Sequence, residues 1–190
     1  APIQVVIVPV AAHKPGVLEK ASEIAETLKK AGLRVKLDDS DQSPGWKYAQ
    51  YEMKGVPLRL EIGPRDIENG NCVLVRRDNR EKTVVALDNL VESTQQMLKD
   101  FAKAIYEKAK ANLEGNITPA HNIQEMKDIL QKRVGFVKAM WCGDEHCEEV
   151  IKNETGMPSR CIPFEQEHID DVCPVCGKPA KYMVIFGIAY

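Results

Sequence analysis

Gln4-Val-Val-Ile-Val-Pro-Val10 is an almost unbroken run of apolar residues near the start of the chain. Such a run, without polar alternation, is typical of a strand that is buried on both faces of a sheet. Over residues 15–32 the apolar residues then recur at helical spacing, and Gly32 is a natural helix end. The apolar positions of that helix are Val17, Leu18, Ala21, Ile24, Ala25, Leu28 and Ala31. A buried strand followed by a crossover helix predicts an α/β fold.

Further strands and helices are predicted as far as residue 112. Ser43 and Pro44 suit the N-cap and first position of a helix, and Asp78-Asn79 suits the turn of a hairpin. The predicted strands cover residues 33–37, 56–62, 72–76 and 82–86, and the predicted helices cover about 43–54 and 87–112. This order predicts a mixed five-stranded sheet flanked by helices.

The pattern breaks around Glu114-Gly115-Asn116, so we predict an α/β domain over 1–115 and a second, small α+β domain over 116–190. The second domain is expected to contain helix 123–132, strands 136–140 and 182–186, and one more helix between two cysteine pairs. A native chain would normally begin with Met, whereas Ala1 leads directly into a strand. We therefore expect a piece of a longer protein.

Composition limits the class of protein. Of the 190 residues, 44% are hydrophobic and 28% charged, which is ordinary for a soluble globular chain. No apolar run approaches the ~20 residues that span a bilayer, and no signal peptide is visible, so a cytoplasmic protein without membrane contact is expected. The net charge of −2 means that any contact with nucleic acid must be local.

Two cysteine pairs carry the strongest chemical signal. Cys142 and Cys147 are separated by four residues, and Cys173-Pro-Val-Cys176-Gly has the form of a zinc knuckle. In a reducing compartment, four thiolates indicate a tetrahedral zinc site rather than disulfides. A shell of four cysteines leaves no position for water, so the metal is expected to be structural.

Other interpretations of the cysteines stay open at this point. The Cys-x-x-Cys motif could be a redox dithiol, the cysteines could be unliganded, or His146 could replace Cys147 as a ligand. Cys161 follows Ser-Arg in what resembles an apolar strand, and Cys72 begins a strand. Both are interpreted as small core residues.

A search for catalytic machinery finds none. The chain has no phosphate-binding Gly-x-x-x-x-Gly-Lys, no Gly-x-Gly-x-x-Gly and no recognisable Ser/His/Asp set. His13 follows the first strand without an obvious partner and is interpreted as a solvated loop residue.

Charged residues gather around the middle strand. Glu52, Lys54, Arg59 and Arg65 should lie near one end of the sheet, and the hairpin adds the nearby cations Arg76, Arg77, Arg80 and Lys82. A solvated charged rim would explain them individually. Together, however, forked guanidinium groups and a carboxylate are what is needed to recognise unstacked guanines.

Several motifs resemble one family. Lys54-Gly-Val-Pro-Leu-Arg-Leu-Glu-Ile-Gly-Pro-Arg-Asp66 and Asp38-Asp-Ser-Asp-Gln-Ser-Pro-Gly45 resemble the anticodon-binding domain of prolyl-tRNA synthetases. The two cysteine pairs, Arg160-Cys-Ile-Pro-Phe164 and the terminal Phe186-Gly-Ile-Ala-Tyr190 resemble the zinc domain of the archaeal/eukaryote-like form. The resemblance spans the whole chain and implies the class II anticodon-binding fold.

This resemblance also implies residue roles. Glu52, Arg59 and Arg65 match positions that recognise the two guanines of a proline anticodon, and Arg65 stands where the family usually has Lys. A further family Lys falls at Arg80 or Lys82. Tyr190 and its carboxylate are expected to dock towards the enzyme's own catalytic domain.

The implied parent enzyme joins proline to tRNA(Pro) with ATP and Mg²⁺, both bound in the catalytic domain that precedes this segment in the family. It is expected to be a homodimer. A free-standing anticodon-domain paralogue without an attached enzyme is the alternative, and a metal-dependent redox protein is disfavoured by the closed thiolate shell.

Overall fold

The computed structural model describes residues 1–132 and 135–188. By internal contacts the chain forms two compact units, Ala1–Glu107 and Lys108–Tyr190. The division between them falls inside helix α4 (Leu90–Gly115). The domain boundary predicted after residue 115 stays a prediction.

The first unit contains a mixed five-stranded sheet with the order β2-β1-β3-β4-β5. β1 pairs in parallel with β2 and β3, whereas β3–β4 and β4–β5 are antiparallel. The predicted mixed sheet is therefore confirmed. The strands are β1 (Val5–Pro9), β2 (Val35–Leu37), β3 (Leu58–Ile62), β4 (Asn71–Arg76) and β5 (Lys82–Ala86). The helices are α1 (Val17–Lys30), α2 (Pro44–Met53), α3 (Pro64–Glu68) and α4, which follows a 3₁₀ turn at Leu87–Asn89.

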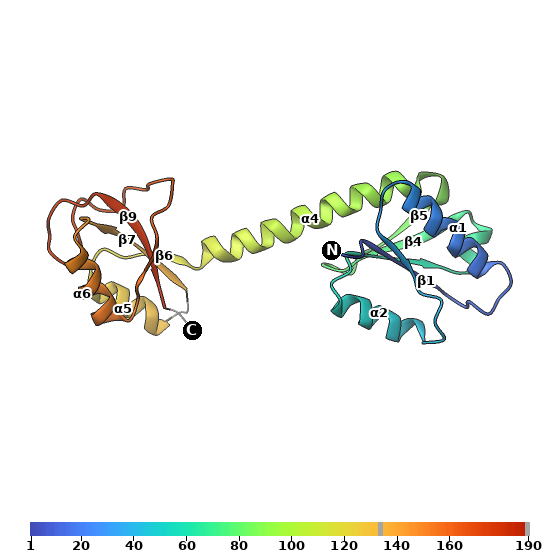
Figure 1. The fold of residues 1–190 in the computed structure, drawn as a ribbon, viewed down its shortest axis with the longest axis horizontal. Helices are drawn as coiled ribbons and strands as arrows, with labels where there is room; N and C mark the ends of the chain where they lie inside the picture. The colour runs from blue at the N-terminus through green and yellow to red at the C-terminus, as the bar shows by residue number, and fades with distance from the viewer. Residues whose placement is uncertain (133–134, 189–190) are drawn as a thin grey trace. The chain divides into compact units, whose positions relative to one another are not determined.

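β1 is buried along its whole length, as its apolar run predicted. Val5 and Ile7 pack on one face into the main core with α1, and Val6 and Val8 pack on the other face near α2. Helices α1 and α2 thus cover opposite faces of the sheet (Figure 1). Helix α3, which was not predicted, is a single five-residue turn after β3.

β3 alternates strictly between these two faces. Its residues Leu58, Leu60 and Ile62 are fully buried in the main core. The intervening Arg59 and Glu61 therefore project from the face on which α2 lies, because successive side chains of a strand point to opposite sides. This alternation places two charged groups beside α2.

A buried ion pair fastens α2 to the loop after β2. The ammonium of Lys47 donates hydrogen bonds to the carbonyl oxygens of Asp38 (3.0 Å) and Ser40 (2.7 Å), and lies 3.5 Å from the Asp38 carboxylate. Burial raises the pKa of Asp38, but hydrogen bonds from the Ser40 hydroxyl and amide and the charge of Lys47 outweigh it. The pKa of Asp38 consequently lies below its usual value of 3.8.

The second unit is a small α+β fold around a four-stranded sheet of order β6-β7-β9-β8. Met126, Ile151, Met157 and Phe186 are central to its core. Its strands are β6 (Ile117–Pro119), β7 (Phe136–Trp141), β8 (Ser159–Cys161) and β9 (Tyr182–Gly187), and its helices are α5 (Ile123–Lys132) and α6 (Glu145–Thr155). Among the described residues of the chain, no helix combines the length and apolarity that crossing a membrane requires.

The buried pair predicts a specific pH dependence. Because the pKa of Asp38 is depressed on folding, its stabilisation is present above about pH 4 and is lost as the pH falls through the folded-state value. Asp38→Asn should therefore reduce the loss of stability between neutral pH and about pH 3. Urea unfolding followed by Trp46 fluorescence in a Trp141→Phe background measures this. Asp39→Asn, at an exposed neighbour, should leave the slope unchanged.

Candidate functional site

An ion-pair network surrounds Arg59 on the α2 face of the sheet. The Arg59 guanidinium donates from Nε to Oε1 of Glu61 at 2.9 Å, and its Nη2 lies 2.9 Å from the same oxygen. On its other side Nη1 donates to Oε1 of Glu52 at 3.3 Å. Glu52 comes from the last turn of α2, so the network joins the helix to the strand.

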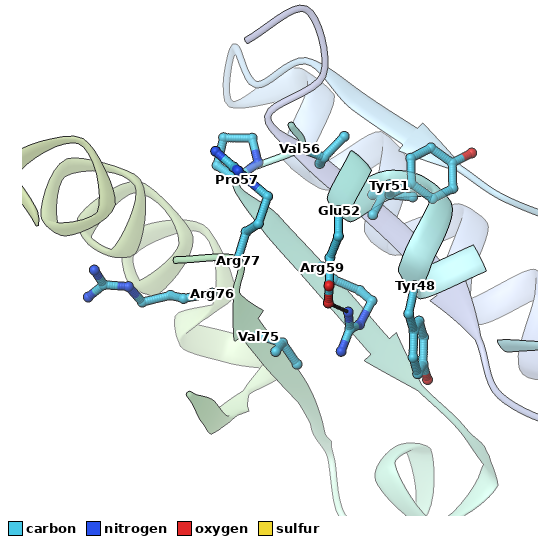
Figure 2. Close-up of a pocket in the computed structure, with 10 residues that line it drawn as sticks. Tyr48, Tyr51, Glu52, Val56, Pro57, Arg59, Val75, Arg76 and Arg77 are labelled. Carbon is cyan, nitrogen blue, oxygen red and sulfur yellow. Dashed lines mark hydrogen bonds and ion pairs between the residues drawn. The ribbon is translucent and has the colours of Figure 1, made fainter. Parts of the chain in front are cut away.

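The aromatic ring of Tyr48 lies against Arg59. The guanidinium carbon is 3.8 Å from the ring centroid, which is a close cation–π contact. Burial, followed by the negative charge of Glu61, raises the pKa of the Tyr48 phenol. Figure 2 shows the Tyr48 ring beside the guanidinium and the Glu52 carboxylate reaching it from α2.

The hairpin supplies two more cations to the same network. Arg80 Nη2 lies 3.3 Å from Oε2 of Glu52, and Lys82 Nζ lies 3.3 Å from Oε2 of Glu61. Both cationic side chains are largely exposed, at 78% and 60%. Each carboxylate is thus shared between Arg59 and one exposed cation, and the whole group carries one net positive charge.

The structure brings together four of the six residues predicted to bind RNA, namely Glu52, Arg59, Arg80 and Lys82. Lys54 caps the carboxyl end of α2, with its ammonium 5.3 Å from the ring centroid of Tyr51. Arg65 is exposed on α3, just beyond the carboxyl end of β3, and is not among the ion pairs that the described residues form.

Two hairpin arginines lie apart from this network. Arg76 pairs with Asp78 at 2.7 Å, and the guanidinium of Arg77 lies 5.4 Å from the ring centroid of Phe101 in α4. Both belong to the lining of the small pocket drawn in Figure 2, where their side chains run away from Arg59. They are therefore tied to other partners.

Tyr48 and Glu61 are the members of the network that sequence reasoning missed. Glu61 stands two residues after Arg59, which places it on the same face of a strand. Tyr48 precedes Glu52 by four residues, which places both on the same side of a helix. These two spacings in the sequence could have indicated that Glu61 and Tyr48 lie beside Arg59 and Glu52.

The chemistry of this network suits exchange with a base edge. Glu61 occupies the Nε–Nη2 edge of Arg59, so the end formed by Nη1 and Nη2 still has N–H groups to donate. The 3.3 Å contact of Glu52 is long for a charge-assisted hydrogen bond, and partly exposed pairs of this kind contribute only about 0–1 kcal/mol. An incoming planar group with matching donors and acceptors can replace it.

The two cysteine pairs converge in the second unit. Four sulfur atoms lie within 4.8 Å of one another, those of Cys142, Cys147, Cys173 and Cys176. Cys142 follows the last residue of β7, and Cys173 and Cys176 precede β9. Because β7 and β9 are antiparallel, with Trp141 opposite Tyr182, the end of one strand meets the beginning of the other.

The surroundings of the sulfurs fit a bound metal ion. Cys142, Cys147 and Cys173 are buried, and burial raises the pKa of the thiols of Cys142 and Cys147, so their thiolates need a cation beside them to be stable. A hydrogen bond from the backbone of Lys178 lowers the pKa of Cys176 to about 7. Four clustered soft donors in a partly buried site are typical of a structural metal centre. His146 is not a member of this group among the described residues.

The remaining cysteines differ from each other. Cys72 is fully buried in the main core, as predicted. The prediction that Cys161 is a core residue is wrong, because its side chain is exposed. Cys161 is the last residue of β8, which forms an edge of its sheet, next to a register irregularity with β9. Tyr190, the predicted docking residue, lies outside the described residues.

Each of the two structural units contains a segment that matches a known protein family. A family model described as "Anticodon binding domain" matches residues 4–97, and one described as "Prolyl-tRNA synthetase, C-terminal" matches residues 123–190. The chain belongs to the prolyl-tRNA synthetase family, as its C-terminal region. Within this family, the sulfur cluster falls in the matched C-terminal segment and the Arg59 network in the anticodon-binding segment.

Relatives in this family are similar along the whole chain. The proline–tRNA ligases of Clostridium botulinum (strain Okra / Type B1), Ruminiclostridium cellulolyticum and Lachnospira eligens are 55%, 54% and 51% identical to it over 190 residues. Each match covers 100% of this chain and 40% of the relative. The chain therefore spans less than half the length of these prolyl-tRNA synthetases.

The contrast between Cys161 and Cys72 can be tested by thiol labelling. Iodoacetamide at neutral pH should modify Cys161 in the folded chain, because this side chain is exposed. Cys72 should react only after unfolding, since burial and the nearby charge of Asp66 raise its pKa to about 12. Peptide mass spectrometry measures both, with Cys161→Ser as the control. Equal protection of the two thiols would contradict the assignment.

Proposed function

We propose that this chain recognises the anticodon of tRNA(Pro), as the RNA-binding part of a proline–tRNA ligase. The observation that carries the proposal is the network of Arg59, Glu52 and Glu61 on the sheet face of the segment matched as an anticodon-binding domain. The relatives that share both units are named proline–tRNA ligases. A proline anticodon presents two adjacent guanines.

Guanine has edges that these side chains can bind. Its O6 and N7 accept two hydrogen bonds from a guanidinium, and its N1–H and N2–H₂ groups donate to a carboxylate. In this proposal Arg59 supplies the donors and Glu52 the acceptor, after Glu52 exchanges its 3.3 Å contact with Arg59 for the base. The exposed cations Arg80 and Lys82 then contact the second guanine or the phosphates.

Lys54 and Arg65 complete the proposed RNA-binding set. Lys54 ends α2 two residues after Glu52, and Arg65 is exposed on α3 just after β3, so both cations lie outside the central network. Lys54 carries a flexible cation that suits phosphate contacts, which position the RNA without reading its sequence. Arg65 matches a family position that recognises the guanines, so we propose that it contacts the second guanine.

The parent enzyme is proposed to attach proline to tRNA in a catalytic domain outside this chain, with ATP and Mg²⁺ bound there. Its homodimerisation, the docking of Tyr190 on its own catalytic domain and its place in the cytoplasm belong to the same proposal. This segment supplies tRNA recognition, and no catalytic residue is assigned within it.

The four-cysteine cluster is proposed to hold Zn²⁺. Four thiolates from Cys142, Cys147, Cys173 and Cys176 would complete a tetrahedral shell, so the ion supplies no catalytic chemistry. Binding of a structural zinc ion contributes about 10–16 kcal/mol to the folding of small domains. The proposed role is to hold the end of β7, the start of α6 and the turn before β9 together.

Removal of either central side chain should weaken RNA binding. Arg59→Ala and Glu52→Ala should each reduce the affinity for a proline anticodon stem-loop by about 1–3 kcal/mol, because each loses a base contact. A fluorescence anisotropy titration measures this, with Lys20→Ala on α1 as the control. Affinity should also fall as salt rises. Wild-type affinity in both variants would refute the assignment, and a flat salt response would indicate a protein partner.

Loss of one cysteine should release the proposed zinc. Elemental analysis of the unsubstituted 190-residue chain should find about one zinc ion per chain, and the Cys173→Ser variant should lose it. Amide hydrogen exchange should then increase beyond about residue 117 while the first unit keeps its protection, because the two units have separate cores. Cys161→Ser, which leaves the cluster intact, should retain the metal. A parent chain purified without any metal would contradict the proposal.

A further inference from the structure

The two carboxylates that contact Arg59 are not equivalent. Oε1 of Glu61 lies 2.9 Å from both Nε and Nη2 on one edge of the Arg59 guanidinium, and the Glu61 side chain is only 11% exposed. Glu52 makes one contact at 3.3 Å and is 30% exposed. Since shorter and better-shielded charge-assisted bonds are stronger, Glu61 is the fixed counter-ion and Glu52 the exchangeable one.

Tyr48 constrains the same guanidinium from another direction. Its ring covers one face of the group at 3.8 Å, while Glu61 holds the Nε–Nη2 edge. Tyr48 and Glu61 leave two parts of the Arg59 guanidinium uncovered, the face opposite the ring and the Nη1–Nη2 end, and a ligand can bind there. Figure 2 shows the Tyr48 ring beside the Arg59 guanidinium.

Fixing a guanidinium changes what it can discriminate. A freely rotating arginine donates to phosphates and to any base acceptor within reach. A fixed one presents two N–H groups in one direction, which matches the paired O6 and N7 acceptors of guanine. Adenine presents an amino donor beside N7 and cannot accept both bonds.

We propose that Tyr48 and Glu61 are positioning residues, which hold Arg59 in one orientation and thereby set the preference for guanine over adenine. This inference rests on the proposed function, in which Arg59 contacts the anticodon. Neither residue needs to touch the RNA to have this effect.

Positioning and simple electrostatics predict different effects of one substitution on the ratio of affinities for guanine and adenine loops. Glu61→Gln removes a negative charge from the site, so electrostatic attraction alone would strengthen binding to every RNA. If Glu61 positions Arg59, the ratio of affinities for guanine and adenine loops must fall even where total affinity rises. The ratio therefore separates the two explanations.

The experiment titrates the 190-residue chain with two stem-loops, one carrying the proline anticodon and one with both of its guanines replaced by adenine. The parent should prefer the guanine loop, and Glu61→Gln and Tyr48→Leu should lower this preference about tenfold. Tyr48→Phe keeps the ring and should retain most of it. Glu81→Gln, which removes an equal charge from an exposed hairpin residue that bonds to Asn79, should match the parent.

The outcomes distinguish the two proposals. Unchanged preference in Glu61→Gln and Tyr48→Leu, or an equal loss in Glu81→Gln, overturns positioning and leaves anticodon recognition standing. A parent chain that does not distinguish the two loops overturns both. Thermal unfolding of each variant shows that it is folded, and if Tyr48→Leu does not fold, Glu61→Gln decides the question alone.

Discussion

The alternation of β3 is the constraint on which the rest of the first unit depends. Leu58, Leu60 and Ile62 are fully buried, and their burial is favourable only if Arg59 and Glu61 face the other way. A slip of one residue in register would turn these two charges into the apolar main core and turn the three apolar side chains toward the charged network on the α2 face. Pairing with β1 and β4 on both sides fixes that register. The packing of the core thus orients the guanidinium on the opposite face.

Much of this arrangement follows from local sequence patterns. The apolar run of β1, the helical spacing of α1, the Ser43-Pro44 start of α2 and the hairpin of β4 and β5 each depend on a short stretch of chain. The charged residues of the site were also identifiable individually. Their association was harder to foresee, because Glu52, Glu61 and Arg80 come from three different elements that only the sheet topology brings together.

The errors have a common physical cause. The exposure of Cys161 depends on the place of its strand in the sheet, and the formation of α3 depends on how the turn after β3 closes. Neither can be inferred from the residues next to them in the sequence. An apolar neighbourhood suggested a core position for Cys161, yet β8 is an edge strand. In the second unit the cysteine pairs were predictable because their spacing is local. Their convergence additionally requires β7 and β9 to run antiparallel.

The buried ammonium of Lys47 links substitutions on one side of α2 to the position of the Tyr48 ring on the same helix. Lys47 directly precedes Tyr48 on α2, so the same turn that is anchored by Asp38 also carries the ring beneath Arg59. A helix that loses its anchor can tilt as a rigid rod without melting. A variant at Lys47 or Asp38 would therefore shift the Tyr48 ring and disturb the Arg59 network, although neither side chain contacts Arg59.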